Sequence, residues 1–231
     1  MKQNGIIKFI IEAVGLDDGM SKGRSMPSEA NPLVKDDNVE PVSGMFSNIR
    51  VVRILLYLSR YTRPYVALDF NICTWYMFST KRSHKLALKR LARYLKKTKD
   101  RGLVLKPNSN TCKVYAYPDA DFYGMYRHEK PTDTVCVKIR TGFITTFSDF
   151  PVLWVSKLQT DTALSTMESE IIATDNCRKE LFPIIEIVTS IGKEVGRPMG
   201  DTMMNVSVHE DNTGDLVLSR TFPPHITTRS R

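Results

Sequence analysis

The hydrophobic pattern of this chain changes near residue 102, and that change limits the folds open to it. Upstream, apolar residues recur every three or four positions, which is typical of helices packed on one face. Downstream, short segments rich in alternating, β-branched or aromatic residues are separated by turn residues, which indicates strands. We therefore expect an α/β protein with a mostly helical part at 1–101 and a sheet-containing part at 102–231.

The pattern places four helices in the first part, at residues 2–14, 49–61, 66–78 and 83–97. Residues 17–48 are rich in Asp, Ser, Gly, Pro and Asn and show no sustained period. This segment is expected to be a long surface loop.

In the second part, residues 113–117, 135–147 and 151–158 are expected to form successive antiparallel strands. Residues 167–191 follow as a long helix, capped at Ser165 and Thr166, with Glu168 in its first turn and Pro183 predicted to kink or split it. A short strand at 204–208 comes next, and 214–218 is a candidate start of a further helix.

Composition excludes several classes of protein. With 231 residues, 42% of them hydrophobic, the chain can bury a substantial core. It contains no run of roughly 20 apolar residues, and Glu12 interrupts the apolar opening, so we expect no signal peptide, no membrane partner and an intracellular location, cytoplasmic or nuclear. The four cysteines form no CxxC pair, which favours reduced thiols over zinc or disulfides.

Charge is divided unevenly along the chain. Residues 1–101 carry 19 Lys or Arg against 9 Asp or Glu, whereas residues 102–231 carry 14 against 16. This division is what a polyanion-binding part followed by a metal-binding, carboxylate-bearing part would show.

Three acids stand where a strand ends or a helix begins: Asp119, Glu170 and Asp211. Carboxylates gathered from a strand, a facing helix and a neighbouring strand repel one another unless cations neutralise them, and two Mg²⁺ or Mn²⁺ ions could hydrolyse a phosphodiester there. Taken singly, each acid is also explained as a turn residue or a helix cap. Asp121, Glu168 and Glu210 compete for the same roles.

Several motifs of the second part resemble the ribonuclease H domain of copia-type retrotransposon Pol polyproteins. The run YPDADFYG at 117–124 resembles that family's Y-x-D-A-D-W-A-G, and TGF at 141–143 resembles part of S-T-S-G-Y. Further on, WVSK at 154–157, ALSTMESEIIA at 163–173 and DNTGDL at 211–216 resemble W-x-S-K, A-L-S-S-T-E-A-E-Y-x-A and D-N-x-A-A-I. The final RSR resembles the start of an R-S/T-K-H element.

Two motifs of the first part extend this resemblance. LYLSRYTRP at 56–64 is similar to the L-L-Y-L-x-x-T-R-P-D-I element that follows the polymerase palm, and residues 84–97 are similar to H-x-x-A-x-R-x-L-R-Y-L-K-G-T. The resemblance implies the helical, thumb- or connection-like end of a reverse transcriptase, followed by a ribonuclease H-like mixed sheet flanked by helices.

Carried over position by position, the resemblance makes Asp119, Glu170 and Asp211 the metal-binding, catalytic acids. Glu170 matches the second Glu of E-A-E, and Glu168 points about 200° away from it on a helix. The implied reaction is two-metal hydrolysis of the RNA strand of an RNA/DNA hybrid during reverse transcription, with the remainder of the Pol polyprotein as a partner.

Departures from the family pattern leave enzymatic activity open. The palm is expected before residue 1, and the fourth acid beyond Arg231. Pro118, Phe122, Tyr123, Tyr65 and Val66 replace family residues. The rival hypothesis is a decayed, non-catalytic fragment that only binds nucleic acid or has no activity.

Between residues 81 and 101 lie ten Lys or Arg and one acid, Asp100. An exposed, solvated face of a helix is by itself enough to explain this concentration of Lys and Arg. The resemblance adds contact with the phosphates of a hybrid, and it gives the candidate nucleic-acid-binding residues Arg82, Lys85, Lys89, Arg93, Lys96 and Lys97.

Overall fold

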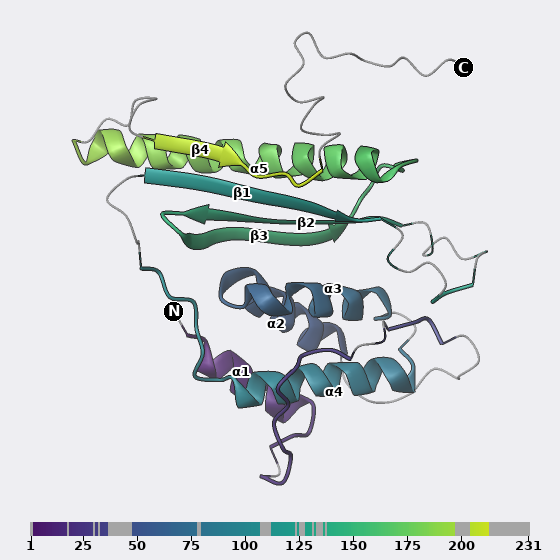
Figure 1. Cartoon of the computed structure of the whole chain (residues 1–231). Helices are drawn as coiled ribbons and strands as arrows, with labels where there is room; N and C mark the ends of the chain where they lie inside the picture. The colour runs from purple at the N-terminus through teal and green to yellow at the C-terminus, as the bar shows by residue number, and fades with distance from the viewer. Residues whose placement is uncertain are drawn as a thin grey trace. The chain divides into compact units, whose positions relative to one another are not determined.

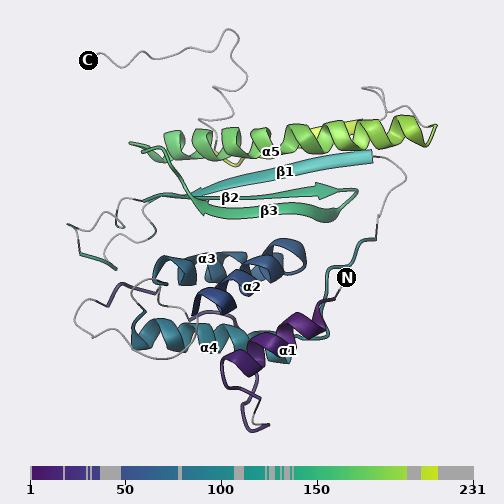
Figure 2. The ribbon, with the colours of Figure 1, turned by 180° about the vertical axis from the view of Figure 1, so that it is seen from behind.

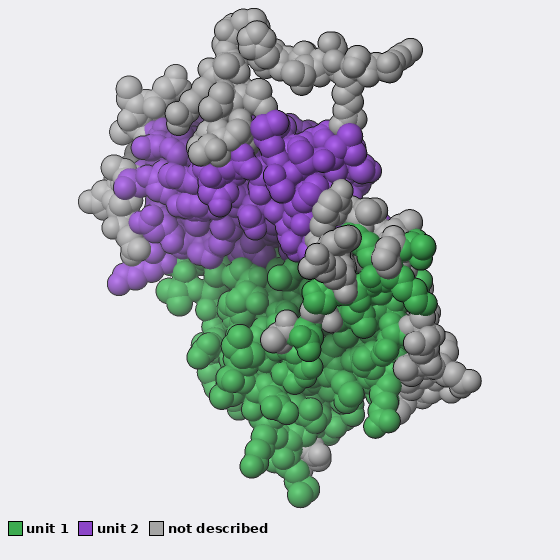
Figure 3. All heavy atoms as spheres, turned by 45° about the vertical axis from the view of Figure 1, so that its right-hand side comes forward, with its two compact units in different colours: residues 1–105, 125–136 green, residues 106–124, 137–231 purple. Residues whose placement is uncertain are grey.

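The computed structural model describes residues 2–17, 19–29, 31, 33–36, 48–77, 80–106, 112–122, 124, 128–130, 132, 136, 138–196 and 204–212. The chain divides into two compact units (Figure 3). Unit 1 comprises residues 1–105 and 125–136, and unit 2 comprises residues 106–124 and 137–231. The expected 214–218 helix lies outside the described residues.

Unit 1 is helical, with α1 (Asn4–Ala13), α2 (Asn48–Tyr61), a 3₁₀ turn η1 (Pro64–Val66), α3 (Ala67–Trp75) and α4 (Arg82–Lys97). Helix α1 packs against α2 and α4, and α3 also packs against both of these (Figure 2). Apolar side chains at helical spacing build the core, among them Ile7, Ile10, Leu55, Leu58 and Leu91. The four expected helices are therefore present, each within a few residues of its predicted ends.

A buried arginine joins two of these helices. Arg63 is 1% exposed, and its guanidinium donates to the carbonyls of Thr98 at 2.9 Å and Lys99 at 3.2 Å, just past the end of α4. It also donates to the Tyr65 hydroxyl. Because the last carbonyls of a helix have no partners within it, Arg63 acts as a cap for α4.

Unit 2 holds a four-stranded mixed sheet in the order β3-β2-β1-β4 (Figure 1). Strands β1 (Cys112–Asp121), β2 (Arg140–Phe147) and β3 (Phe150–Leu158) form an antiparallel meander, and β4 (Met204–Val208) runs parallel to β1. The predicted strand at 135–147 begins only at Arg140. The α/β class is confirmed for the described part of the chain.

Helix α5 (Thr166–Glu194) connects β3 to β4 and packs on one face of the sheet (Figure 1). Val114 and Ala116 alternate toward it and meet Cys177 and Leu181, all 4% exposed or less. The helix is continuous through Pro183, so the predicted split is wrong. Proline removes one backbone donor, and at an exposed position water can satisfy the carbonyl left over.

Among the described residues, no helix is both long and apolar enough to cross a membrane. The four cysteines are free thiols; Cys136 and Cys177 are buried, and the other two are half-buried.

Candidate carboxylate site

The start of α5 determines which of its glutamates faces the sheet. Ser165 is the N-cap, and its hydroxyl accepts a hydrogen bond of 3.1 Å from the Glu168 amide. The Glu168 carboxylate accepts a 2.7 Å bond from the Leu164 amide in return. Glu168 therefore serves the helix cap, while Glu170 lies on the buried side of the helix.

Glu170 is 9% exposed, and its carboxylate accepts a hydrogen bond from the backbone of Ala120 on β1. The Oε2 atom of the same carboxylate is buried and has no hydrogen-bond partner among the described residues. A buried carboxylate oxygen without a donor is costly. Such an atom marks a place where a proton or a cation would stabilise the site.

The charge around Glu170 is negative. Burial, followed by the charges of Glu210, Asp119 and Asp211 in that order, raises the pKa of Glu170 to about 7. The charges of the other two predicted acids, Asp119 and Asp211, therefore both act on Glu170. The structure also adds Glu210, which is the strongest acidic neighbour of Glu170.

Glu210 turns toward α5. Its Oε2 accepts a 2.9 Å hydrogen bond from the Thr174 hydroxyl, one helical turn after Glu170, and its Oε1 accepts from the amides of Asp211 and Asn212 at 3.1 Å each. Alternation along β4 explains this direction, because Val208 faces the same core and Glu210 is two residues further. That alternation was the sequence signal for Glu210.

Asp119 and Asp211 are both exposed and lie at the ends of neighbouring strands. Asp119 pairs with Gly142 in the β1–β2 ladder and alternates away from the α5 face. Asp211 lies three residues after β4. Their assignment as metal-binding acids remains a prediction.

A stacked aromatic pair adjoins these two acids. The rings of Tyr117 and His209 are 4.9 Å apart and inclined by 13°, and the Tyr115 ring meets His209 edge-on. The His209 amide donates to the Ala116 carbonyl at 2.8 Å, which holds the start of the 209–212 segment against β1. His209, two residues before Asp211, is therefore fixed by both its backbone and its ring.

Asp121, the other acid of the 117–124 motif, belongs to a different cluster. It pairs across the sheet with Arg140, which is 7% exposed and donates to the Ser156 hydroxyl at 3.0 Å. Burial lowers the pKa of Arg140 to about 10, and the Asp121 charge acts in the opposite direction. Gly124 abuts the Asp121 carboxylate so closely that any Cβ there would collide with it. Sequence reasoning missed Arg140, Thr174 and the Ala120 amide.

The donor set around Glu170 consists of carboxylate oxygens, which suit a hard divalent cation. Within the described residues, no group of three or more His, Cys, Asp or Glu side chains is arranged to hold a metal ion. The donors near Glu170 are thus of the type that a hard divalent cation prefers, but the described side chains are not arranged as a set of metal ligands.

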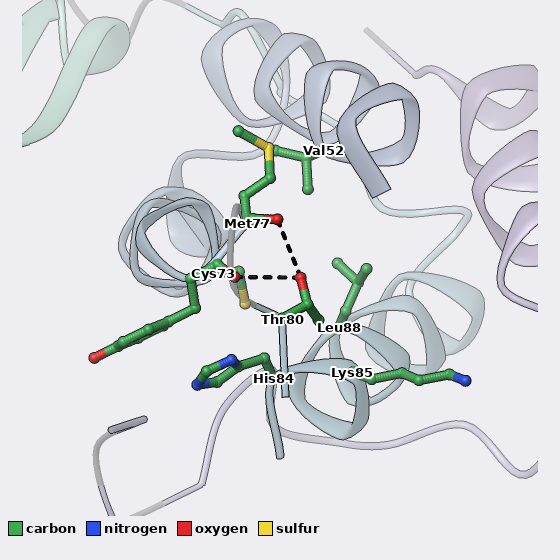
Figure 4. Close-up of a pocket in the computed structure, with 8 residues that line it drawn as sticks. Val52, Cys73, Met77, Thr80, His84, Lys85 and Leu88 are labelled. Carbon is green, nitrogen blue, oxygen red and sulfur yellow. Dashed lines mark hydrogen bonds between the residues drawn. The ribbon is translucent and has the colours of Figure 1, made fainter. Parts of the chain in front are cut away.

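The predicted nucleic-acid-binding residues all lie on α4. Arg82 and Lys97 are exposed, while Lys85, Lys89, Arg93 and Lys96 are half-buried. Lys96 donates to the Leu16 carbonyl at 2.7 Å, so one of its donors is used within unit 1. Lys85 borders a cavity of about 20 Å³ near Cys73 and His84, with its ammonium group extending away from the other lining residues (Figure 4). That cavity is large enough only for a water molecule.

His84 closes the first turn of α4. Its Nδ1 accepts a 3.0 Å hydrogen bond from the Lys81 amide, its Nε2 lies 2.7 Å from the Val34 carbonyl, and its ring stacks on Tyr76. It is a helix-start residue, and it helps to hold the preceding loop.

Unit 2 is an α/β unit. Its mixed sheet carries acids at the ends of its strands, and a helix that bears a further acid packs on one face of the sheet. Sequence comparison adds a separate line of evidence. Over 148 residues, 64% of this chain, it is 34% identical to the retrovirus-related Pol polyprotein from transposon RE2 of Arabidopsis thaliana and 32% identical to that from transposon RE1 of the same plant. These matches cover 10% and 9% of the two relatives.

The chain therefore resembles a segment of retrovirus-related Pol polyproteins from copia-type transposons, and it spans about a tenth of the length of the relatives it matches. It is also 30% identical, over 132 residues, to the secreted RxLR effector protein 161 of Plasmopara viticola, covering 57% of this chain and 87% of that protein. No protein-family model and no solved structure matches the chain.

Proposed function

We propose that unit 2 is a ribonuclease H-like domain that hydrolyses the RNA strand of RNA/DNA hybrids, and that unit 1 is the thumb- or connection-like end of a reverse transcriptase. The observation that carries the proposal is the environment of Glu170. A buried carboxylate with an unpartnered oxygen, surrounded by Glu210, Asp119 and Asp211, is a site that favours a cation. The similarity to Pol polyproteins supports the choice of an RNA/DNA hybrid as substrate.

In this proposal Asp119, Glu170 and Asp211 hold the divalent cations, with Glu210 beside them. Bound Mg²⁺ or Mn²⁺ would activate a water molecule and stabilise the leaving oxygen of the phosphodiester. The protein's part is to keep the carboxylates in place. The Ala120 amide orients Glu170, and Thr174 together with the amides of Asp211 and Asn212 orients Glu210.

The aromatic pair beside the site, Tyr117 and His209, would help to position the substrate. Tyr117 is 40% exposed and, like Asp119, alternates away from the α5 face of β1. A ribose or base lying on its ring would bring the adjoining phosphate toward the carboxylates. In the same proposal, the α4 cations Arg82, Lys85, Lys89, Arg93, Lys96 and Lys97 contact phosphates without reading the sequence.

The decisive experiment incubates the purified chain with an RNA/DNA hybrid labelled on the RNA strand, in Mg²⁺ or Mn²⁺. We expect cleavage of the RNA strand, and its loss in Asp119→Asn and in Glu170→Gln. Asp161→Asn, which changes an exposed acid in the loop before α5, serves as the matched control. Cleavage that survives both site substitutions would refute the assignment of the site.

The alternative function is that of a non-catalytic remnant that binds nucleic acid. The observation that favours it is that, in the described part of the chain, the acids are not grouped in threes for a metal. Salt-sensitive binding of the hybrid without cleavage in either metal would establish this alternative.

A further inference from the structure

A loop that carries Lys22 and Arg24 lies along α4 in unit 1. The described residues between Leu16 and Glu29, which we call the strap, contain no helix or strand. Three contacts tie the strap to the helix: Lys96 Nζ donates to the Leu16 carbonyl at 2.7 Å, the Arg24 amide donates to the Arg93 carbonyl at 3.3 Å, and Glu29 pairs with Arg90. Later residues of the strap contact earlier residues of α4, so the two segments run antiparallel.

Gly23 permits the close approach of the strap. A Cβ at this position would lie 2.6 Å from Lys97 Cβ and 3.3 Å from Lys97 Cα. Those atoms belong to the helix itself and cannot swing aside as the end of a long side chain would. The strap therefore rests directly on α4 at Gly23.

Between the strap and the helix lies an open hollow of about 560 Å³. It is lined by Met20, Ser21, Lys22, Gly23, Arg24 and Arg93. Three of these six residues are cationic, and none is acidic. The nearby Glu29 carboxylate is paired with Arg90, and Asp17 does not line the hollow. A concave site with this charge attracts an anion.

We propose that this hollow binds a backbone phosphate of a nucleic-acid strand, held by Lys22, Arg24 and Arg93. Arginine forks match phosphate oxygens, and lysine supplies a further point charge. A polymer fits better than an isolated phosphate because the cationic row of α4 continues beyond the hollow, through Lys89 toward Arg82 at intervals of three or four residues. The proposal rests on the proposed function only for the nature of the polyanion.

The test measures binding of a fluorescent 20-base-pair RNA/DNA hybrid to the full chain in EDTA, across a series of salt concentrations. The variant Lys22→Gln/Arg24→Gln removes two side chains that are both exposed, so its fold should persist. We expect weaker binding at every salt concentration, and a slope of log affinity against log salt that is shallower by about one per lost contact. Arg53→Gln, an exposed change on α2, should leave both unchanged.

A second variant separates shape from charge. Gly23→Ala keeps every cation but pushes the strap off α4, so it should also weaken binding, with a thermal midpoint close to that of the wild type. Equal affinity and slope for the wild type and Lys22→Gln/Arg24→Gln would overturn the proposal. Protection of strap amides from hydrogen exchange by millimolar inorganic phosphate but not by the hybrid would also overturn it. Because Glu170→Gln leaves the hollow untouched, its effect on cleavage reports on the proposed function separately.

Discussion

The hydroxyl of Thr174 donates a 2.9 Å hydrogen bond to the carboxylate of Glu210, and this bond joins helix α5 to the segment after β4. Both residues are at least partly buried, and Thr174 is 3% exposed. The contact thus links the two elements that bring Glu170 and Glu210 together. Its loss should be measurable in the stability of unit 2.

Thr174→Val keeps the shape of the side chain but removes the donor. We expect a loss of about 1.5 to 2 kcal/mol in the free energy of unfolding, because a hydrogen bond to a charged group contributes more than a neutral one. Urea denaturation followed by the fluorescence of Trp154, in a Trp75→Phe background, reports on unit 2. Thr174→Ser retains the hydroxyl and should retain most of the stability. Equal losses in both variants would contradict the role of the bond.

Glu170 should make the metal-free protein less stable as pH rises. Its pKa is about 7 in the folded state, against an ordinary value of 4.5, so the folded state binds the proton more tightly. Stability therefore falls as pH rises from about 4.5 to about 7, and the full penalty applies above that range.

The variant Glu170→Gln removes this penalty. In EDTA at pH 8 it should be more stable than the wild type by about 1 to 3 kcal/mol, and at pH 4 the difference should vanish. Addition of Mg²⁺ should reduce the difference at pH 8, since a cation stabilises only the charged carboxylate cluster. If the stabilities of the two proteins changed in parallel across this pH range, the raised pKa of Glu170 would be ruled out.

Arg63 should be among the most sensitive positions of unit 1. Arg63→Met keeps a similar apolar length but leaves the carbonyls of Thr98 and Lys99 without its guanidinium. We expect a loss of about 3 kcal/mol, because the guanidinium is buried and its hydrogen bond to the Thr98 carbonyl is buried as well. The matched control is Arg60→Met, at an exposed position of α2. Trp75 fluorescence in a Trp154→Phe background follows unit 1, and equal effects of the two substitutions would refute the capping role.

The β2–β3 turn should accept glycine with a gain in stability. Ser148 and Asp149 connect the strands with φ of 46° and 71°, which a residue with a Cβ rarely adopts. Asp149→Gly should therefore raise the free energy of unfolding of unit 2 by about 0.5 to 1 kcal/mol. Asp161→Gly, in a loop without positive φ, should lower it or leave it unchanged. A stability loss at position 149 would count against this turn geometry.

Two cysteines should react slowly with thiol reagents in the folded protein. Burial raises the pKa of Cys73 to about 12 and that of Cys177 to about 11, and the thiolate is the reactive form. At pH 8 we expect labelling at these positions to be at least roughly a hundredfold slower than in urea. Mass spectrometry of the labelled peptides measures both rates. Fast labelling of Cys177 without denaturant would contradict its place in the core between α5 and the sheet.

The sequence by itself determined the secondary structure to a large extent. Helical spacing located α1 to α4, alternation located β1 to β3, and the Ser165 cap located the start of α5. These are local properties, set by which side of an element is apolar and which residues can end it. The predicted split of α5 at Pro183 was wrong, because a helix can continue past one missing hydrogen bond at an exposed position.

Only the tertiary structure decided how the acids are shared out. The sequence contains six candidate acids, which lie in three pairs of residues one or two positions apart. Helix geometry alone separated Glu168 from Glu170, but only the fold pairs Asp121 with Arg140 and sets Glu210 beside Glu170, whose pKa the charges of Asp119 and Asp211 also raise. The physical reason is that acids on a strand, a helix and a second strand come together only when these elements pack against one another. The sequence of any one element does not determine that packing. The strap on α4 has the same origin, since Gly23 meets Lys97 only after the chain has folded.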